Sequence, residues 1–153
     1  MKPKTTGIPE NRATLGALLR TPYRRLQSRL YGELAEKFPE IRQAHSAVFR
    51  HISEEGSRLT DLADEAEMSK QSMAYLVGYL AEHGYVRTED HPDDGRARRV
   101  FLTAKGLRFV GAALTVSARL EAGAAAKMGA ERVVELRQLL TELGDAFAKS
   151  EQG

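Results

Sequence analysis

The segment from Arg58 to Thr103 constrains the fold most, because it predicts two short helices followed by a two-stranded hairpin. Apolar residues in the second helix recur at the spacing i, i+3, i+4, i+7, which predicts one buried face. These residues are Met73, Leu76, Val77 and Leu80. Ser69 precedes this helix as an N-terminal cap, and Gly84 follows it as a C-terminal cap. The first helix is brief, and we expect Thr60 to cap it.

The hairpin follows directly after this second helix. An extended run begins at Tyr85, and residues 98–102 form the matching return strand. The turn sequence HPDDG, residues 91–95, lies between them. Two helices joined by a turn and followed by a hairpin predict a winged helix-turn-helix, a mainly α fold with a small β-hairpin wing.

The second helix has a polar face opposite its apolar stripe. A recognition helix presents polar side chains in its first two turns to base edges and phosphates in the major groove of DNA. The residues expected to bind DNA from this face are Ser69, Lys70, Gln71, Ser72 and Tyr75. The amide of Gln71 can pair with adenine, whereas Ser69, Lys70 and Ser72 suit phosphates.

The tip of the hairpin carries the remaining expected DNA contacts. Arg96 is expected to enter the minor groove, which is narrow and electronegative over A·T-rich DNA. Asp94 is expected to orient the tip, and Arg98 adds a cation beyond it. The simpler role for Asp93, Asp94 and Gly95 is that of an ordinary hairpin turn.

These motifs resemble the MarR family of bacterial transcriptional regulators. The resemblance rests on RLTDLA, MSKQSM, LxxHGYV and DDGR, with LT at the start of the next helix, and the flanking helical segments match in order. It implies an obligate homodimer with one winged reader in each subunit, and usually a repressor that a small molecule or oxidation releases from DNA. Such a dimer would bridge two half-sites of a pseudo-palindrome. The resemblance also implies that Asp94 pairs with a neighbouring arginine.

The net charge is only +2, so any affinity for DNA has to come from placed cations. Residues 1–52 carry ten basic and four acidic residues, a net charge of +6, whereas residues 58–102 carry six and nine, a net charge of −3. The chain has no cysteine, which excludes disulfides, thiolate zinc sites and the thiol-based peroxide sensing of the family. We expect no cofactor, no metal and no enzymatic activity, since neither the four histidines nor any loop forms a catalytic motif.

No run of residues is long and apolar enough for a membrane span or a secretory signal, so we expect a cytoplasmic protein. A flexible arm is expected over residues 1–10 and a single domain over 11–153. Within that domain, residues 40–103 form the reader, and residues 11–38 and 104–149 form dimerisation helices. Pro22 predicts a kink in the first helix, or a restart capped by Thr21. Gly129 divides the last two helices, of which the second carries an apolar stripe too broad for one small core.

A helix is expected over 41–52, with His45 on its apolar face. A buried imidazole needs a polar partner, and the candidates are Tyr23, Arg24 and Tyr31. These four residues are the candidates for binding a small aromatic or anionic effector, although a histidine satisfied within the core is the simpler interpretation. Four arginines of the first helix form either a solvated face or a site for phosphate or an effector anion. They are Arg20, Arg24, Arg25 and Arg29.

A second class of function is also compatible with the sequence. A winged-helix dimer can act as a protein-interaction module that does not bind DNA. Changing Arg96 and Gln71 separates the two classes, because only a DNA reader loses duplex binding when they are replaced.

Overall fold

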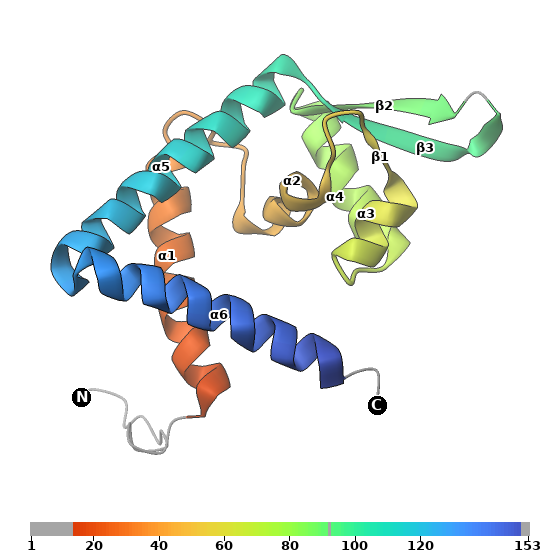
Figure 1. Ribbon diagram of the computed structural model, residues 1–153. Coiled ribbons are helices and arrows are strands. Elements are labelled where there is room, and N and C mark those ends of the chain that lie inside the picture. Colours follow the sequence, from red (N-terminus) through yellow and green to blue (C-terminus); the bar gives the residue numbers. More distant parts are fainter. Residues whose placement is uncertain (1–13, 92, 151–153) are drawn as a thin grey trace, which may run out of the picture. The chain divides into compact units, whose positions relative to one another are not determined.

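The computed structural model describes residues 14–91 and 93–150, and it describes only the backbone of residues 91, 94–96, 149 and 150. The predicted arm at residues 1–10 lies outside this range. The elements, in chain order, are α1 (Leu15–Leu34), the 3-10 helix η2 (Gln43–His45), α2 (Ser46–His51), β1 (Ser57–Arg58), α3 (Leu59–Glu65), α4 (Lys70–Glu82), β2 (Val86–His91), β3 (Asp94–Leu102), α5 (Ala104–Met128) and α6 (Ala130–Ser150) (Figure 1). The mainly helical fold with a small wing is confirmed. The chain divides into two compact units, one ending at Ala112 and one beginning at Ala113.

Helix α1 begins after Thr14, whose hydroxyl accepts the N–H of Ala17 at 3.3 Å. It runs through Pro22 as one helix, so the predicted restart at Thr21 is wrong. A proline removes one backbone donor, and the neighbouring hydrogen bonds of this helix are enough to continue it. The helix ends at Leu34 rather than Phe38, because the Leu34 carbonyl accepts the N–H groups of both Lys37 and Phe38 in a closing turn.

The single helix predicted for residues 41–52 is also wrong, since η2 and α2 divide the segment. The side chain of His45 explains where the helical turns begin. Its Nδ1 accepts the N–H of Arg42 at 2.9 Å, which caps the segment from within.

The core of the first unit forms around α4. Met73, Val77 and Leu80 of this helix are buried together with Leu62 of α3, as the helical spacing predicted. Aromatic rings from distant segments extend the core, with Phe38 packed edge-on against Phe109 at 5.3 Å between centroids.

The sheet has three strands in the order β1-β3-β2, one more than the sequence predicted. Ser57 and Arg58 pair with Val100 and Arg99, a strand that the sequence did not indicate. Helix α3 starts directly after this strand, so its cap position is Arg58 and the predicted cap at Thr60 is wrong. Strand β3 begins at Asp94, earlier than the predicted residues 98–102.

Gly56, which precedes β1, has a φ of +83°, and a Cβ placed there would overlap the ring of Phe101. Glycine is therefore required at this position for two independent reasons, its backbone conformation and the close approach of the ring.

The second unit contains the end of α5 and all of α6. Gly129 separates the two helices with a φ of +101°, as its position predicted. Arg137 of α6 forms an ion pair with Glu121 of α5. In the part of the chain that the structure describes, no helix has the length and apolar character needed to cross a membrane.

Candidate nucleic-acid interface

The start of α4 is fixed by two serines. The Ser69 hydroxyl accepts the N–H of Ser72 at 3.1 Å and lies 2.8 Å from the Ser72 hydroxyl, to which it donates. The first turn contains no acidic residue, so the positive end of the helix dipole stays available to an anion. Helix α4 thus has both a fixed start and a favourable electrostatic environment for phosphate.

The polar face of α4 is exposed, as the sequence predicted. Ser69, Lys70, Gln71 and Ser72 are exposed together with Tyr75, whose side chain is 75% exposed. Met73, between them in sequence, is fully buried. The structure therefore brings all five predicted residues of this helix together at its outer, N-terminal end.

The turn before α4 sets its direction relative to α3. Glu67 has a φ of +52°, and the N–H of Met68 donates to the carbonyl of Ala63 at 2.8 Å. A non-glycine residue in the left-handed region is uncommon, and here it closes the turn between the two helices.

The wing is anchored at its base by arginines. Arg99 donates to the carbonyl oxygens of Glu55 and Gly56 at 3.0 and 3.2 Å, and Arg87 lies 4.3 Å from the centre of the Phe101 ring. Arg98 is exposed and faces Asp90 in the register of β2 and β3. The side chains of the predicted contacts Arg96 and Asp94 lie outside the described part of the structure.

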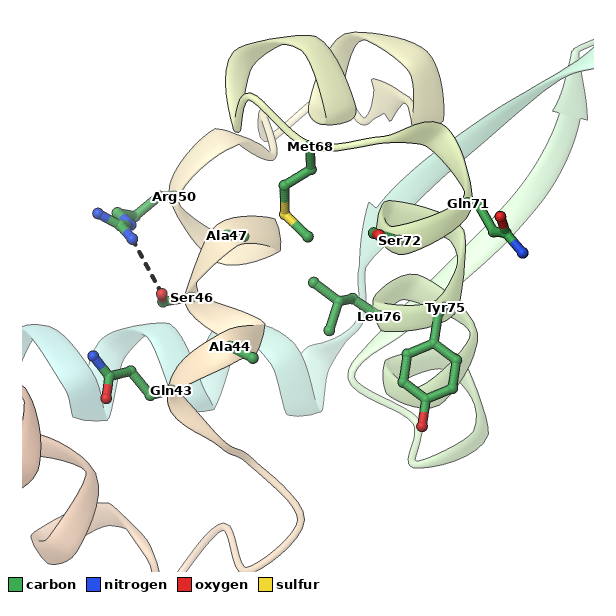
Figure 2. A pocket seen from close by; sticks show the side chains of 10 residues that line it. All are labelled: Gln43, Ala44, Ser46, Ala47, Arg50, Met68, Gln71, Ser72, Tyr75 and Leu76. Carbon is green, nitrogen blue, oxygen red and sulfur yellow. Dashed lines mark hydrogen bonds between the residues drawn. The ribbon is translucent and has the colours of Figure 1, made fainter.

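A shallow groove of about 810 Å³ separates α2 from the first half of α4 (Figure 2). Small and apolar side chains from both helices form its floor, and Gln71, Ser72 and Tyr75 line its α4 side. Arg50 lines the α2 side, where its guanidinium donates to the Ser46 hydroxyl at 3.2 Å. The sequence analysis missed Arg50 and Ser46, because only tertiary packing places them beside α4.

The four candidate effector residues are placed differently from one another. Arg24 lines a hollow of about 410 Å³ with Thr21, Arg25, Ser28 and Gln43. Tyr31 is partly buried, which raises the pKa of its hydroxyl although Ser46 hydrogen-bonds to it. Tyr23 is 43% exposed.

His45 has a partner other than those the sequence suggested. Besides accepting the N–H of Arg42, its ring stacks on Tyr79 at 4.8 Å between centroids. The proposed pairing with Tyr23, Arg24 or Tyr31 is therefore wrong for the Nδ1 atom, because a nearer backbone donor satisfies it. Burial lowers the pKa of His45, and the charges of Arg42 and His83 lower it further.

A polar network joins the reader to α5, and no sequence motif indicated it. Tyr85 donates to a Glu40 carboxylate oxygen at 2.8 Å, which holds the pKa of that carboxyl below its usual value. Tyr79 donates to the Glu40 carbonyl at 3.0 Å. Lys105 of α5 donates to the His83 carbonyl at 2.9 Å, with its ammonium 4.3 Å from the centre of the Tyr85 ring. The end of α4 is thus held against the start of α5.

The helix-turn-helix and its three-stranded wing define a winged helix-turn-helix protein. Residues 41–97 match the sequence model of the MarR family. Transcriptional regulator HosA of Escherichia coli O111:H- is 26% identical over 111 residues, which cover 72% of this chain and 82% of that protein. These matches confirm the resemblance to the MarR family that the sequence motifs indicated.

Solved structures share the fold over most of the chain. The crystal structure of MarR has a TM-score of 0.76 at 20% identity and covers 90% of this chain and 99% of that one. The S. aureus MepR–DNA complex has a TM-score of 0.71 at 16% identity, and the match covers 88% of this chain and 98% of the MepR chain. A third structure is that of the PcaV transcriptional regulator from Streptomyces coelicolor in complex with its natural ligand. It has a TM-score of 0.67 at 19% identity, and the match covers 92% of this chain and 98% of the PcaV chain.

Proposed function

We propose that this chain regulates transcription by binding duplex DNA in a sequence-specific way, with α4 in the major groove. The observation that carries the proposal is the division of α4 into a fully buried apolar face and an exposed polar face at its capped N-terminal end. A recognition helix needs this arrangement, because the buried face fixes the helix while the polar face meets the bases. The likeness in fold to MepR, a protein solved in complex with DNA, supports it.

The roles within the interface follow from side-chain chemistry. Gln71 can donate and accept at once, which suits bidentate pairing with adenine, whereas Lys70 suits phosphate. The hydroxyls of Ser69 and Ser72 are engaged in the cap and contact phosphate from there. Arg96 enters the minor groove at the wing, with Asp94 orienting the tip and Arg98 contacting the backbone.

The active form in this proposal is a homodimer on a pseudo-palindrome. Apolar side chains are exposed along α6, with Leu136 41%, Leu140 44% and Phe147 61% exposed. Their helical spacing puts them on one stripe, and a symmetric partner would bury it. Two recognition helices would then enter half-sites roughly 34 Å apart, one turn of the DNA.

Regulation in this proposal is repression of target genes in the cytoplasm, relieved by a small aromatic or anionic effector. The effector residues proposed from the sequence are His45, Tyr23, Arg24 and Tyr31. Of these, Arg24 has the clearest structural support, because it lines a hollow with a second arginine and hydroxyl groups. The likeness in fold to PcaV, solved with its natural ligand, supports the existence of an effector.

The test starts with DNA fragments selected from the host genome by the wild-type protein. Gln71→Ala should relax the preference for one base in each half-site by about 1–3 kcal/mol, measured by competition between single-base variants of the site. Glu82→Ala, at the far end of the same helix, is the control and should leave the preference unchanged. An unchanged preference in Gln71→Ala would show that the register assigned to α4 is wrong.

The competing proposal is a winged-helix dimer that binds a protein and not DNA. Arg96→Ala distinguishes the two, because removing the wing arginine should weaken duplex binding and make its salt dependence shallower by about one unit. If the wild-type protein selects no DNA and shows no salt-dependent affinity for any duplex, the protein-interaction module is the better account.

A further inference from the structure

The groove between α2 and α4 has features that the recognition helix alone does not explain. Three of the residues proposed to meet DNA, Gln71, Ser72 and Tyr75, line its α4 side, so the groove adjoins the proposed DNA-binding face (Figure 2). None of the ten residues lining the groove is acidic, whereas the reader segment as a whole is negatively charged. A polyanion is therefore not repelled at this part of the surface.

Arg50 supplies the positive charge of the groove from the α2 side. It lies one helical turn after Ser46, whose hydroxyl accepts from the guanidinium at 3.2 Å. This hydrogen bond orients the exposed arginine side chain. A guanidinium has five N–H donors, and the bond to Ser46 uses one of them, so the rest can bind a phosphate in a bidentate way.

Tyr75 lines the groove from α4, whereas Arg50 lines it from α2, and the Tyr75 side chain is 75% exposed (Figure 2). A large exposed ring next to an apolar floor offers a surface for a deoxyribose, and its hydroxyl can donate to a phosphate oxygen. The groove thus combines an apolar surface with donors on both sides, which suits an alternating sugar and phosphate chain.

We infer that the groove between α2 and α4 holds the sugar-phosphate backbone at the edge of each half-site, with Arg50 of α2 binding one phosphate. This inference rests on the proposed function and adds a second helix to the DNA interface. Arg50 contributes affinity without reading sequence, in contrast to Gln71, which lies on the opposite side of the same groove.

Salt titration of the wild type, Arg50→Ala and Arg50→Lys provides the first measurement, on the selected site and on a scrambled duplex. Arg50→Ala should weaken binding to both duplexes by a similar factor and make the slope of log K against log salt shallower by roughly 0.9 for each phosphate that the protein no longer neutralises. Arg50→Lys should restore most of the slope. Arg108→Ala is the matched control, because Arg108 is an exposed arginine of α5 that does not line the groove, and its slope should equal that of the wild type.

Neutral methylphosphonate groups, placed at one phosphate at a time, locate the phosphate that Arg50 binds. One position in each half-site should weaken binding of the wild type, and the same position should have no effect on Arg50→Ala. If the salt slope of Arg50→Ala equals that of the wild type, the inference is overturned, and Arg50 is a solvated cation at the end of α2. If Gln71→Ala still changes base preference in that case, the proposed function stands and this inference alone fails.

Discussion

The two units of the chain differ in how they bury apolar side chains. In the first unit, Met73, Leu80 and Tyr85 are completely buried around α4. Among the described residues from 113 to 148, no side chain is buried, and Leu114 and Leu139 are 67% and 53% exposed. The first unit therefore carries its own core, whereas the second exposes apolar side chains that the proposed dimer would bury.

The largest effect should come from a charge placed in the stripe of α6. Leu140→Glu puts a carboxylate at the centre of the proposed interface in both subunits, and removal of two buried leucines is worth about 3–6 kcal/mol. The dissociation constant of the dimer should rise at least about a hundredfold. Light scattering should show the mass falling from twice 16.9 kDa to 16.9 kDa.

Gln138→Glu is the control for this prediction, because it adds the same charge to an exposed position on another side of α6. It should leave the mass unchanged. If Leu140→Glu also remains at the wild-type mass, the stripe does not form the dimer, and the contrast between the two units needs another explanation.

The core of the first unit is tested by Leu80→Ala. Leu80 is fully buried, so truncation should lower the free energy of unfolding by about 2–5 kcal/mol through reduced burial and the cavity it leaves. Urea denaturation in the Leu140→Glu background measures the reader without the contribution of a partner. Tyr75→Ala, on the exposed face of the same helix, should change the free energy by no more than about 0.5 kcal/mol. Equal losses in the two variants would contradict a core centred on α4.

Alanine substitutions at two glycines with a positive φ, one in each unit, allow the packing of the two units to be compared. Gly56→Ala and Gly129→Ala both force an alanine into a positive φ, which costs about 1–2 kcal/mol. At Gly56 the new methyl group also has to displace the ring of Phe101, whereas nothing lies within 4 Å of a Cβ at Gly129. Thermal unfolding should therefore show a loss about 1–3 kcal/mol larger for Gly56→Ala. Similar losses would mean that the loop before β1 adjusts freely.

The smallest predicted effect is on the pH dependence of the unfolding free energy. Burial first, and then the charges of Arg42 and His83, hold the pKa of His45 below the value of 6.5 expected in the unfolded chain. The unfolded chain therefore binds this proton more readily, so the stability that neutral His45 contributes is present above pH 6.5 and is lost as the pH falls below it. His45→Asn keeps an acceptor for the Arg42 N–H and removes the titration. Its unfolding free energy should decline less than that of the wild type between pH 7 and pH 5, and parallel curves would exclude His45 as the source.

The sequence predicted those elements whose signals are local. Helix α4 has its cap at Ser69, its period of buried residues and its final glycine within one segment, and all three were found. Strand β1 has only two residues, and it exists because β3 lies beside it, so no local pattern could indicate it. The partner of His45 was missed for the opposite reason, since a local backbone donor was overlooked in favour of distant side chains. The exposed face of α4 was predictable in the same local way, but Arg50 joins it only through the packing of α2.

The junction at Thr103 has a mechanical consequence for the reader. The Tyr85 carbonyl accepts both the N–H and the hydroxyl of Thr103, at 3.1 and 3.0 Å, and the absence of a side chain at Gly106 lets the same carbonyl approach the first turn of α5. Lys105 adds its bond to the end of α4. The first turn of α5 is thus held against the start of the wing, and we expect these two segments to move together.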